Sequence, residues 1–178
     1  MSVLAPVNTE HVKTAVADHV AWITIDHPER HNSFDLATQT DLTAAFRACG
    51  SDPSIGAIVL TGAGDKAFCA GGYLKDLADP DMNQLHQLFV GTVELVNAIR
   101  QVRQPVIAAV NGFAMGGGNE LVVACDFAVA SDRAVLGQTG PRIGSAPVVG
   151  GTNMLTLMIG EKRAKEVSFL CRRYTAEQ

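Results

Sequence analysis

The sequence has little basic charge and no long apolar run, and each absence excludes a class of function. The 14 lysines and arginines are outnumbered by 18 aspartates and glutamates, which leaves a net charge of -4 and no basic field for nucleic acid. No apolar stretch approaches the roughly 20 residues that a membrane-spanning helix needs. Residues 1–15 lack the basic start and apolar centre of a signal peptide. We therefore expect no nucleic-acid partner, no membrane partner and a cytoplasmic protein.

Cysteine is also scarce, and its spacing excludes two kinds of scaffold. The four cysteines are Cys49, Cys69, Cys125 and Cys171, and no two of them form a CxxC pair. A zinc site or a compact disulfide framework needs closely spaced cysteines. We expect reduced thiols and no metal site.

Segments of strand and helix character alternate along the chain, which predicts a single α/β domain over residues 1–178. Hydrophobic residues make up 47% and charged residues 18%, as in a globular protein with a sizeable core. No strand is expected after Leu170. The predicted strands are Thr14–Val20, Ala21–Asp26, Ala57–Thr61, Val106–Val110, Phe127–Ala130 and Val135–Leu136, and the predicted helices are Leu36–Cys49, Met82–Val102, Glu120–Cys125 and Asn153–Leu170.

Two glycine-rich loops follow two of the predicted buried strands. Ala67–Gly72 (AFCAGG) comes after the first, and Asn111–Gly118 (NGFAMGGG) comes after the second and runs into a helix. Such loops at the carboxyl ends of strands are where α/β sheets place ligands. Amides at a helix start point outward without an intrahelical partner. Two such loops side by side would give two N–H donors for one oxygen that gains charge, although glycines in either loop alone also suit a plain tight turn.

Glu120 has its own physical case as an acid or base. It lies in the first turn of the predicted helix, three residues after Gly117, so its side chain can stay near the glycine loop. A carboxylate beside a developing enolate can move a proton or direct water. The competing interpretation is a glutamate that only stabilises the helix start.

The sequence resembles the crotonase family, the enoyl-CoA hydratase/isomerase superfamily, in four stretches that follow the family's order along the chain. They are WITIDHPERHNSF (Trp22–Phe34), AIVLTGAGDKAFCAGG (Ala57–Gly72), QPVIAAVNGFAMGGGNEL (Gln104–Leu121) and CDFAVAS (Cys125–Ser131). The resemblance implies a crotonase-like ββα spiral and a homotrimer or dimer of trimers. It also implies an acyl-CoA thioester substrate, with coenzyme A as part of that substrate and no tightly bound cofactor. Family members usually continue through a further helical region, which is apparently missing here.

The resemblance also assigns roles to particular residues. Gly72 and Gly117 fall on the amides that hold the thioester oxygen, and Glu120 falls on the family's first catalytic glutamate. The remaining expected contacts are with coenzyme A or substrate. In the first half of the chain they are His31, Ala70, Gly71, Tyr73 and Leu74. In a third loop rich in glycine and proline, Gly137–Thr152, they are Gln138, Thr139, Gly140 and Ser145.

The third loop departs from the pattern of a two-glutamate hydratase. No carboxylate occurs between Asp132 and Glu161, so the second catalytic glutamate has no counterpart. Two stretches, GQTGPRIGS (Gly137–Ser145) and GEKRAKEVSFLCRRYTAEQ (Gly160–Gln178), instead resemble a subgroup of ring-forming and ring-cleaving enzymes, the 1,4-dihydroxy-2-naphthoyl-CoA synthases and 2-ketocyclohexanecarboxyl-CoA hydrolases. That subgroup usually lacks a glutamate at the Glu120 position. Three functions remain open at this point: a hydratase or isomerase that uses Glu120, a ring-forming or ring-cleaving C–C enzyme, and a non-catalytic CoA-binding paralogue or inactive fragment.

Overall fold

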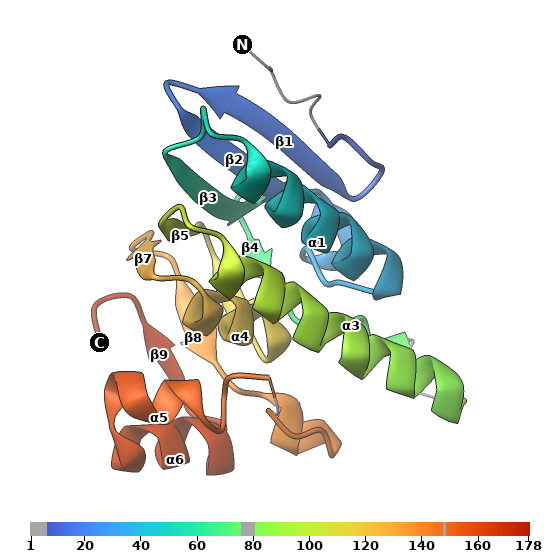
Figure 1. Cartoon of the computed structure of the whole chain (residues 1–178). Coiled ribbons are helices and arrows are strands. Elements are labelled where there is room, and N and C mark those ends of the chain that lie inside the picture. Colours follow the sequence, from blue (N-terminus) through green and yellow to red (C-terminus); the bar gives the residue numbers. More distant parts are fainter. Residues whose placement is uncertain (1–6, 76–80, 148) are drawn as a thin grey trace.

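Two β-sheets and the helices around them make up the computed structural model, which describes residues 7–75, 81–147 and 149–178 (Figure 1). The larger sheet has the strand order β1-β2-β3-β5-β7, and the smaller sheet has the order β4-β6-β8-β9. The strands are β1 Val12–Ala17, β2 Val20–Ile25, β3 Ala57–Gly62, β4 Ala67–Cys69, β5 Val106–Val110, β6 Phe113–Met115, β7 Phe127–Ala130, β8 Val135–Gly137 and β9 Arg173–Thr175. The helices are α1 Leu36–Ser51, α3 Met82–Gln101, α4 Gly117–Ala124, α5 Met154–Ile159 and α6 Glu161–Phe169, with short 3-10 helices η1 Pro28–Arg30 and η2 Gly140–Ile143.

A strand–strand–helix unit repeats along the chain. Each strand of the larger sheet from β3 onward is followed by a strand of the smaller sheet and then by helix, as in β3-β4-α3, β5-β6-α4 and β7-β8-α5-α6. Within each sheet the strands of successive units pair in parallel. Parallel pairing requires a crossover, and the helices supply it. The predicted crotonase-like ββα spiral is therefore confirmed.

The chain enters the larger sheet through an antiparallel hairpin of β1 and β2. Its two-residue turn, Asp18 and His19, has φ values of 49° and 64°. Both central residues of a type I′ turn need positive φ, and this turn matches the right-handed twist of the flanking strands. The first predicted strand thus ends at Ala17 instead of Val20.

The core lies between the larger sheet and the helices α1 and α3, which lie side by side over it (Figure 1). Alternate residues of the strands point inward, as the period of two requires. Full burial of such a side chain stabilises by about 1.5–3 kcal/mol. The fully buried large apolar side chains are Ile23, Ile25, Leu42, Phe46, Ile58, Leu60, Phe68, Leu95, Ile99 and Leu121.

Three strands and one helix break were not predicted. β4 and β6 lie inside the two glycine-rich loops, and β9 follows Leu170, where no strand was expected. The predicted helix Asn153–Leu170 is two helices, because Gly160 between them has φ 81° and ψ 155°. That conformation is strained for any residue with a Cβ and interrupts the helical backbone.

Candidate functional site

Backbone hydrogen bonds attach the first glycine loop to the segment between η1 and α1. The amide of Ala70 donates to the carbonyl of His31 at 3.0 Å, and the amide of Tyr73 donates to the carbonyl of Phe34 at 2.9 Å. In return, the amide of Phe34 donates to the carbonyl of Gly71 at 2.9 Å. These contacts form a parallel bridge between Phe34 and Gly72.

The bridge also sets the direction of the Gly72 amide. The carbonyl and the following N–H of a trans peptide point in opposite directions. Because the carbonyl of Gly71 faces Phe34, the N–H of Gly72 points away from Phe34. No described residue accepts a hydrogen bond from this N–H.

The Gly117 amide is directed by the start of α4. The amide of Glu120 donates to the carbonyl of Gly116 at 3.0 Å, so this carbonyl points along the helix. The N–H of Gly117 belongs to the same peptide and therefore points out of the helix start. It too has no acceptor within the described part of the chain, and the helix dipole adds a partial positive charge there.

The two amide-bearing loops touch each other at Gly71. This residue has φ 94°, and a Cβ on it would lie 2.8 Å from the carbonyl oxygen of Met115 and 3.0 Å from the nitrogen of Gly117. Only glycine combines this backbone conformation with so close an approach. Gly71 therefore lets the loop that carries Gly72 lie directly against the loop that carries Gly117.

Glu120 is buried beside these loops, with 7% of its surface exposed. Its Oε1 accepts hydrogen bonds from the amides of Val149, at 2.8 Å, and Gly151, at 3.2 Å. Among the described residues, Oε2 has no donor. Burial raises the pKa of this carboxyl above 4.5 and outweighs the two amide hydrogen bonds, which lower it. One oxygen is thus fixed while the other is free to exchange a proton.

A pocket of about 460 Å³ collects the two glycines and the carboxylate. Of the predicted site residues, Gly72, Gly117, Glu120 and Ser145 line it. The rest of its wall is apolar except for one hydroxyl, and Glu120 is the one acid among the described lining residues. The other lining residues are Phe34, Leu88, Phe89, Thr92, Ala146 and Val149.

The wall formed by α3 was not recognised as part of a site from the sequence. Leu88, Phe89 and Thr92 fit the helical spacing of a core-facing stripe. The buried residues of α3 lie from Thr92 onward, however, and these three side chains line the pocket. Phe89 is 39% exposed, but a single exposed apolar side chain does not indicate a site, so the sequence held no signal for this wall.

Most of the residues predicted to contact coenzyme A lie outside this pocket. His31 lines a neighbouring hollow of about 360 Å³ together with Lys66, at the side of the first glycine loop. Ala70 and Leu74 are exposed on that loop. Tyr73 is half-buried, and its ring lies under the guanidinium of Arg30, 4.4 Å from Cζ to the ring centroid.

The third loop divides between the pocket and the interior. Ser145 lines the pocket, and its amide donates to the carbonyl of Gly140 at 3.0 Å. Gln138 is buried, and its Nε2 has no acceptor among the described residues. A Cβ on Gly151 would lie 2.9 Å from this Nε2, so Gln138 packs behind the segment that holds Glu120. Thr139 lies just before η2.

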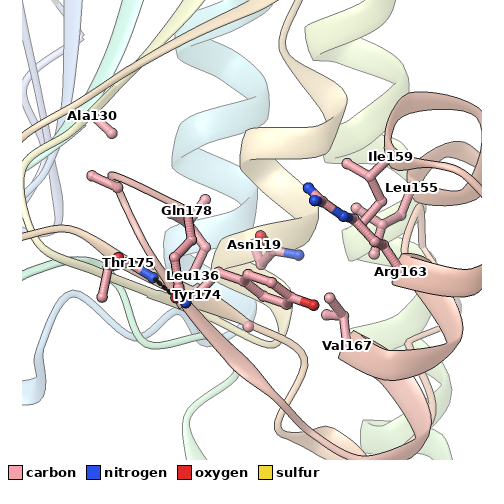
Figure 2. A pocket seen from close by; sticks show the side chains of 12 residues that line it. Asn119, Ala130, Leu136, Leu155, Ile159, Arg163, Val167, Tyr174, Thr175 and Gln178 are labelled. Atoms are coloured by element: carbon pink, nitrogen blue, oxygen red, sulfur yellow. Dashed lines mark hydrogen bonds between the residues drawn. The ribbon is translucent and has the colours of Figure 1, made fainter.

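A larger hollow of about 740 Å³ lies between α4, α6 and β9 (Figure 2). Asn119 of α4, Arg163 of α6 and Tyr174 of β9 face it, together with mostly apolar side chains. None of the predicted site residues lines it.

No helix among the described residues is long and apolar enough to cross a bilayer. No three histidine, cysteine, aspartate or glutamate side chains in the described ranges are grouped so that they could hold a metal ion.

The model of the family "Enoyl-CoA hydratase/isomerase" matches residues 15–178. The chain therefore belongs to the enoyl-CoA hydratase/isomerase family.

Solved structures of this family are similar to the chain over nearly its whole length. A structure of DspI from Pseudomonas aeruginosa is 35% identical with a TM-score of 0.91, and the match covers 96% of this chain and 69% of that one. An enoyl-CoA hydratase from Bacillus anthracis is 37% identical with a TM-score of 0.91, covering 94% and 66%. An enoyl-CoA hydratase from Polaromonas sp. is 31% identical with a TM-score of 0.88, covering 93% and 65%. The chain thus spans about two thirds of the length of these proteins.

Proposed function

We propose that this chain is an acyl-CoA enzyme of the hydratase/isomerase type. In this proposal the amides of Gly72 and Gly117 form an oxyanion hole for the thioester oxygen, and Glu120 carries the proton. One observation supports it above all: two unpaired amides on touching loops share a pocket with one buried carboxylate.

The proposed chemistry begins with the thioester carbonyl between the two N–H groups. Oε2 of Glu120 takes a proton from the carbon next to the carbonyl, and the C–H electron pair moves into a C=C bond as the oxygen becomes an enolate. Each amide donor to such an oxygen is typically worth about 2.7–4 kcal/mol. In a 3-enoyl thioester the enolate is conjugated with the C3=C4 bond, so Glu120 can return the proton to C4, which re-forms the thioester carbonyl and leaves the double bond between C2 and C3. This isomerisation needs a single acid/base.

The surroundings of Glu120 suit this role. A carboxyl whose pKa is raised by burial accepts a proton more readily near neutral pH than an exposed glutamate does. The two amides on Oε1 hold the group in place. Oε2, which no described residue engages, is then the oxygen that faces the substrate.

We assign coenzyme A to the neighbouring surface, as part of the substrate and not as a tightly bound cofactor. His31, Ala70, Gly71 and Leu74 contact it in this proposal, and the ammonium of Lys66 suits its phosphates. The tyrosine and third-loop residues predicted as substrate contacts, Tyr73, Gln138, Thr139 and Gly140, act behind or beside the pocket. A single domain, a homotrimer or dimer of trimers and a cytoplasmic location complete the proposal.

Ser145 favours a second candidate, a ring-forming or ring-cleaving C–C enzyme. Its position in the pocket beside Gly117 and Glu120 is what the loop resemblance implies for a residue that hydrogen-bonds a cyclic substrate. A panel of thioesters separates the candidates. Turnover of 3-enoyl-CoA or crotonyl-CoA supports the first, and turnover of a cyclic β-keto acyl-CoA alone supports the second.

The deciding experiment combines this panel with the variant Glu120→Gln. We expect turnover to fall by at least a hundredfold, within the usual range for a lost acid/base of about 10²–10⁴, while the acyl-CoA dissociation constant stays within about twofold. Glu94→Gln, on the exposed side of α3, is the matched control. Unchanged turnover by Glu120→Gln would refute the proposal, and no turnover of any thioester by the parent chain would point to a non-catalytic CoA-binding protein or an inactive fragment.

A further inference from the structure

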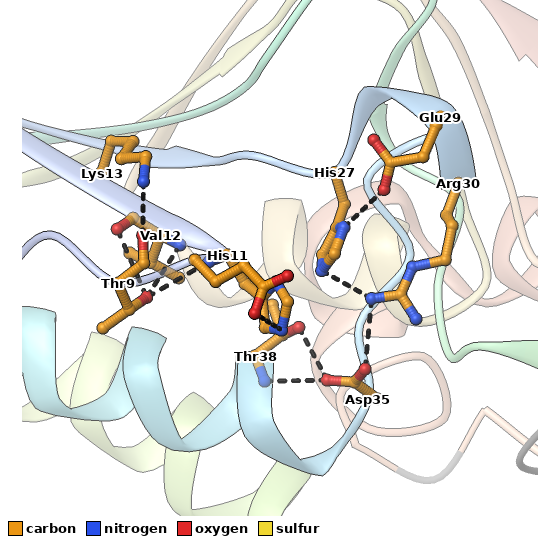
Figure 3. Close-up of polar contacts among 10 residues, drawn as sticks. Thr9, His11, Val12, Lys13, His27, Glu29, Arg30, Asp35 and Thr38 are labelled. Carbon is orange, nitrogen blue, oxygen red and sulfur yellow. Dashed lines mark hydrogen bonds and ion pairs between the residues drawn. The ribbon is translucent and has the colours of Figure 1, made fainter.

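A polar cluster lies between the start of β1, η1 and the start of α1 (Figure 3). His27 is at its centre and is 8% exposed. Its Nδ1 lies 2.6 Å from Oε1 of Glu29, and its Nε2 lies 2.5 Å from Nη2 of Arg30. None of these three residues belongs to the pocket.

These contacts fix the protonation state of His27. A carboxylate can only accept a hydrogen bond, so Nδ1 carries a proton and donates it to Glu29. A guanidinium can only donate, so Nε2 is unprotonated and accepts from Arg30. The neutral Nδ1–H imidazole is therefore the form that satisfies both neighbours.

Arg30 connects this imidazole to the glycine loop. Its Nη2 also donates to Oδ2 of Asp35 at 3.2 Å, and its guanidinium lies over the ring of Tyr73. Such a cation–π contact holds a ring in place. Tyr73 directly follows Gly72, and its own amide is bonded to Phe34. The guanidinium thus braces the residue next to the proposed oxyanion donor.

We propose that Arg30 is a positioning residue for the Gly72 amide, and that neutral His27 keeps Arg30 in place. This inference rests on the proposed function for its catalytic consequence, but its structural part stands alone. Protonation of His27 would set an N–H on Nε2 against the guanidinium, two donors and two positive charges at hydrogen-bond distance. Arg30 then leaves His27 and Tyr73, and the loop that carries Gly72 loosens.

The other charged groups around His27 set the direction of this response. The ring of His11 stacks on it, with centroids 3.9 Å apart, and Glu10 lies 4.0 Å from Nε2 of His11. Glu29 and Asp35 favour positive charge in the cluster, whereas Arg30 and a protonated His11 oppose it. Because the release requires His27 to take up a proton, it occurs on acidification.

An NMR titration tests the structural part without any substrate. The backbone ¹⁵N–¹H resonance of Gly72 is followed from pH 8 to pH 5 in four proteins: the parent chain, Glu120→Gln, His27→Gln and Arg30→Met. The glutamine in His27→Gln keeps an acceptor for Arg30 and does not titrate. In the parent chain and in Glu120→Gln, we expect the chemical shift of Gly72 to change with the same pH midpoint as the protonation of the His27 ring. In His27→Gln and Arg30→Met, we expect this change to be absent. A transition that persists in Arg30→Met, or its absence from the parent chain, would overturn the proposal.

Turnover tests the catalytic part. Arg30→Met should lower kcat about tenfold with little change in KM. His27→Gln should have the kcat of the parent chain at pH 8, and its kcat should fall less than that of the parent chain when the pH is lowered to 5.5. Arg47→Met, at an exposed position of α1, is the control. An unchanged kcat in Arg30→Met would overturn the positioning role. If no thioester is turned over, the proposed function fails, and the Gly72 titration still decides whether the His27–Arg30 contact governs this loop.

Discussion

Replacing Gly71 by alanine should separate the two glycine loops and disable the site without changing any of the groups assigned to chemistry. The added Cβ would lie 2.8 Å from the carbonyl oxygen of Met115 and 3.0 Å from the nitrogen of Gly117, and both neighbours are backbone atoms. The positive φ adds about 1–3 kcal/mol of strain, and overpacking adds typically 1–3 kcal/mol. We expect a loss of about 2–6 kcal/mol in the free energy of unfolding.

The same displacement should lower kcat by about 10²–10³, the usual effect of losing one oxyanion donor. Gly160→Ala is the matched control, because Gly160 has φ 81° and a Cβ there meets nothing within 4 Å. The control should share the strain and keep full activity. Both variants are assayed where circular dichroism shows them folded, with stability from urea titration. Gly71→Ala with the kcat of the parent chain would refute the reasoning that Gly71 sets the distance between the amides.

Three further predictions follow from buried groups. Because burial raises the pKa of Glu120, the contribution of this carboxyl to stability is fully present below pH 4.5 and is lost as pH rises through the native pKa. In urea titrations the stability of Glu120→Gln relative to the parent chain should therefore increase from pH 4 to pH 8. An equal stability difference at both pH values would contradict this. Asn32→Asp removes the donors to the carbonyls of Ala63 and Ala67 and should destabilise by about 2–6 kcal/mol at pH 7, with partial recovery in acid; a change below 1 kcal/mol would argue against the buried role of Asn32. Burial raises the pKa of Cys69 and Cys125 to about 12, so both thiols should react with a disulfide reagent only after unfolding, and rapid modification of the native protein would show that these sites open.

The sequence predicted the long elements well because their patterns are local. The apolar strands Val106–Val110 and Phe127–Ala130 appear in the structure with the predicted bounds. The three-residue strands β4 and β6 were missed because their identity as strands comes from pairing with each other, while glycines on both sides indicate a loop. The break at Gly160 was missed because the segments on both sides of this glycine are helical, so that only the backbone conformation of Gly160 separates them.

The candidate site divides along the same line. The glycines and Glu120 were identified because their motifs lie in short stretches of sequence, and the structure brings them into one pocket. Leu88 and Phe89 were not, because nothing in a helical stripe says whether it meets a core or a cavity. The contact of Arg30 with His27 is local, because the two residues are three positions apart at η1, whereas its contact with Tyr73 depends on the bridge between two loops, and no spacing in the sequence reveals it.

Hydrogen exchange at the carbon next to the thioester tests the central claim most directly. A saturated acyl-CoA such as butyryl-CoA is incubated with the protein in D₂O, and deuterium at the α-carbon is followed by NMR or mass spectrometry. If the Gly72 and Gly117 amides stabilise the enolate and Glu120 carries the proton, the parent chain catalyses this exchange. Gly71→Ala then catalyses it at least a hundredfold more slowly, because one oxyanion donor is lost. Glu120→Gln shows no measurable exchange. Exchange by Glu120→Gln at the rate of the parent chain, or no exchange by the parent chain with the thioester bound, would contradict this account.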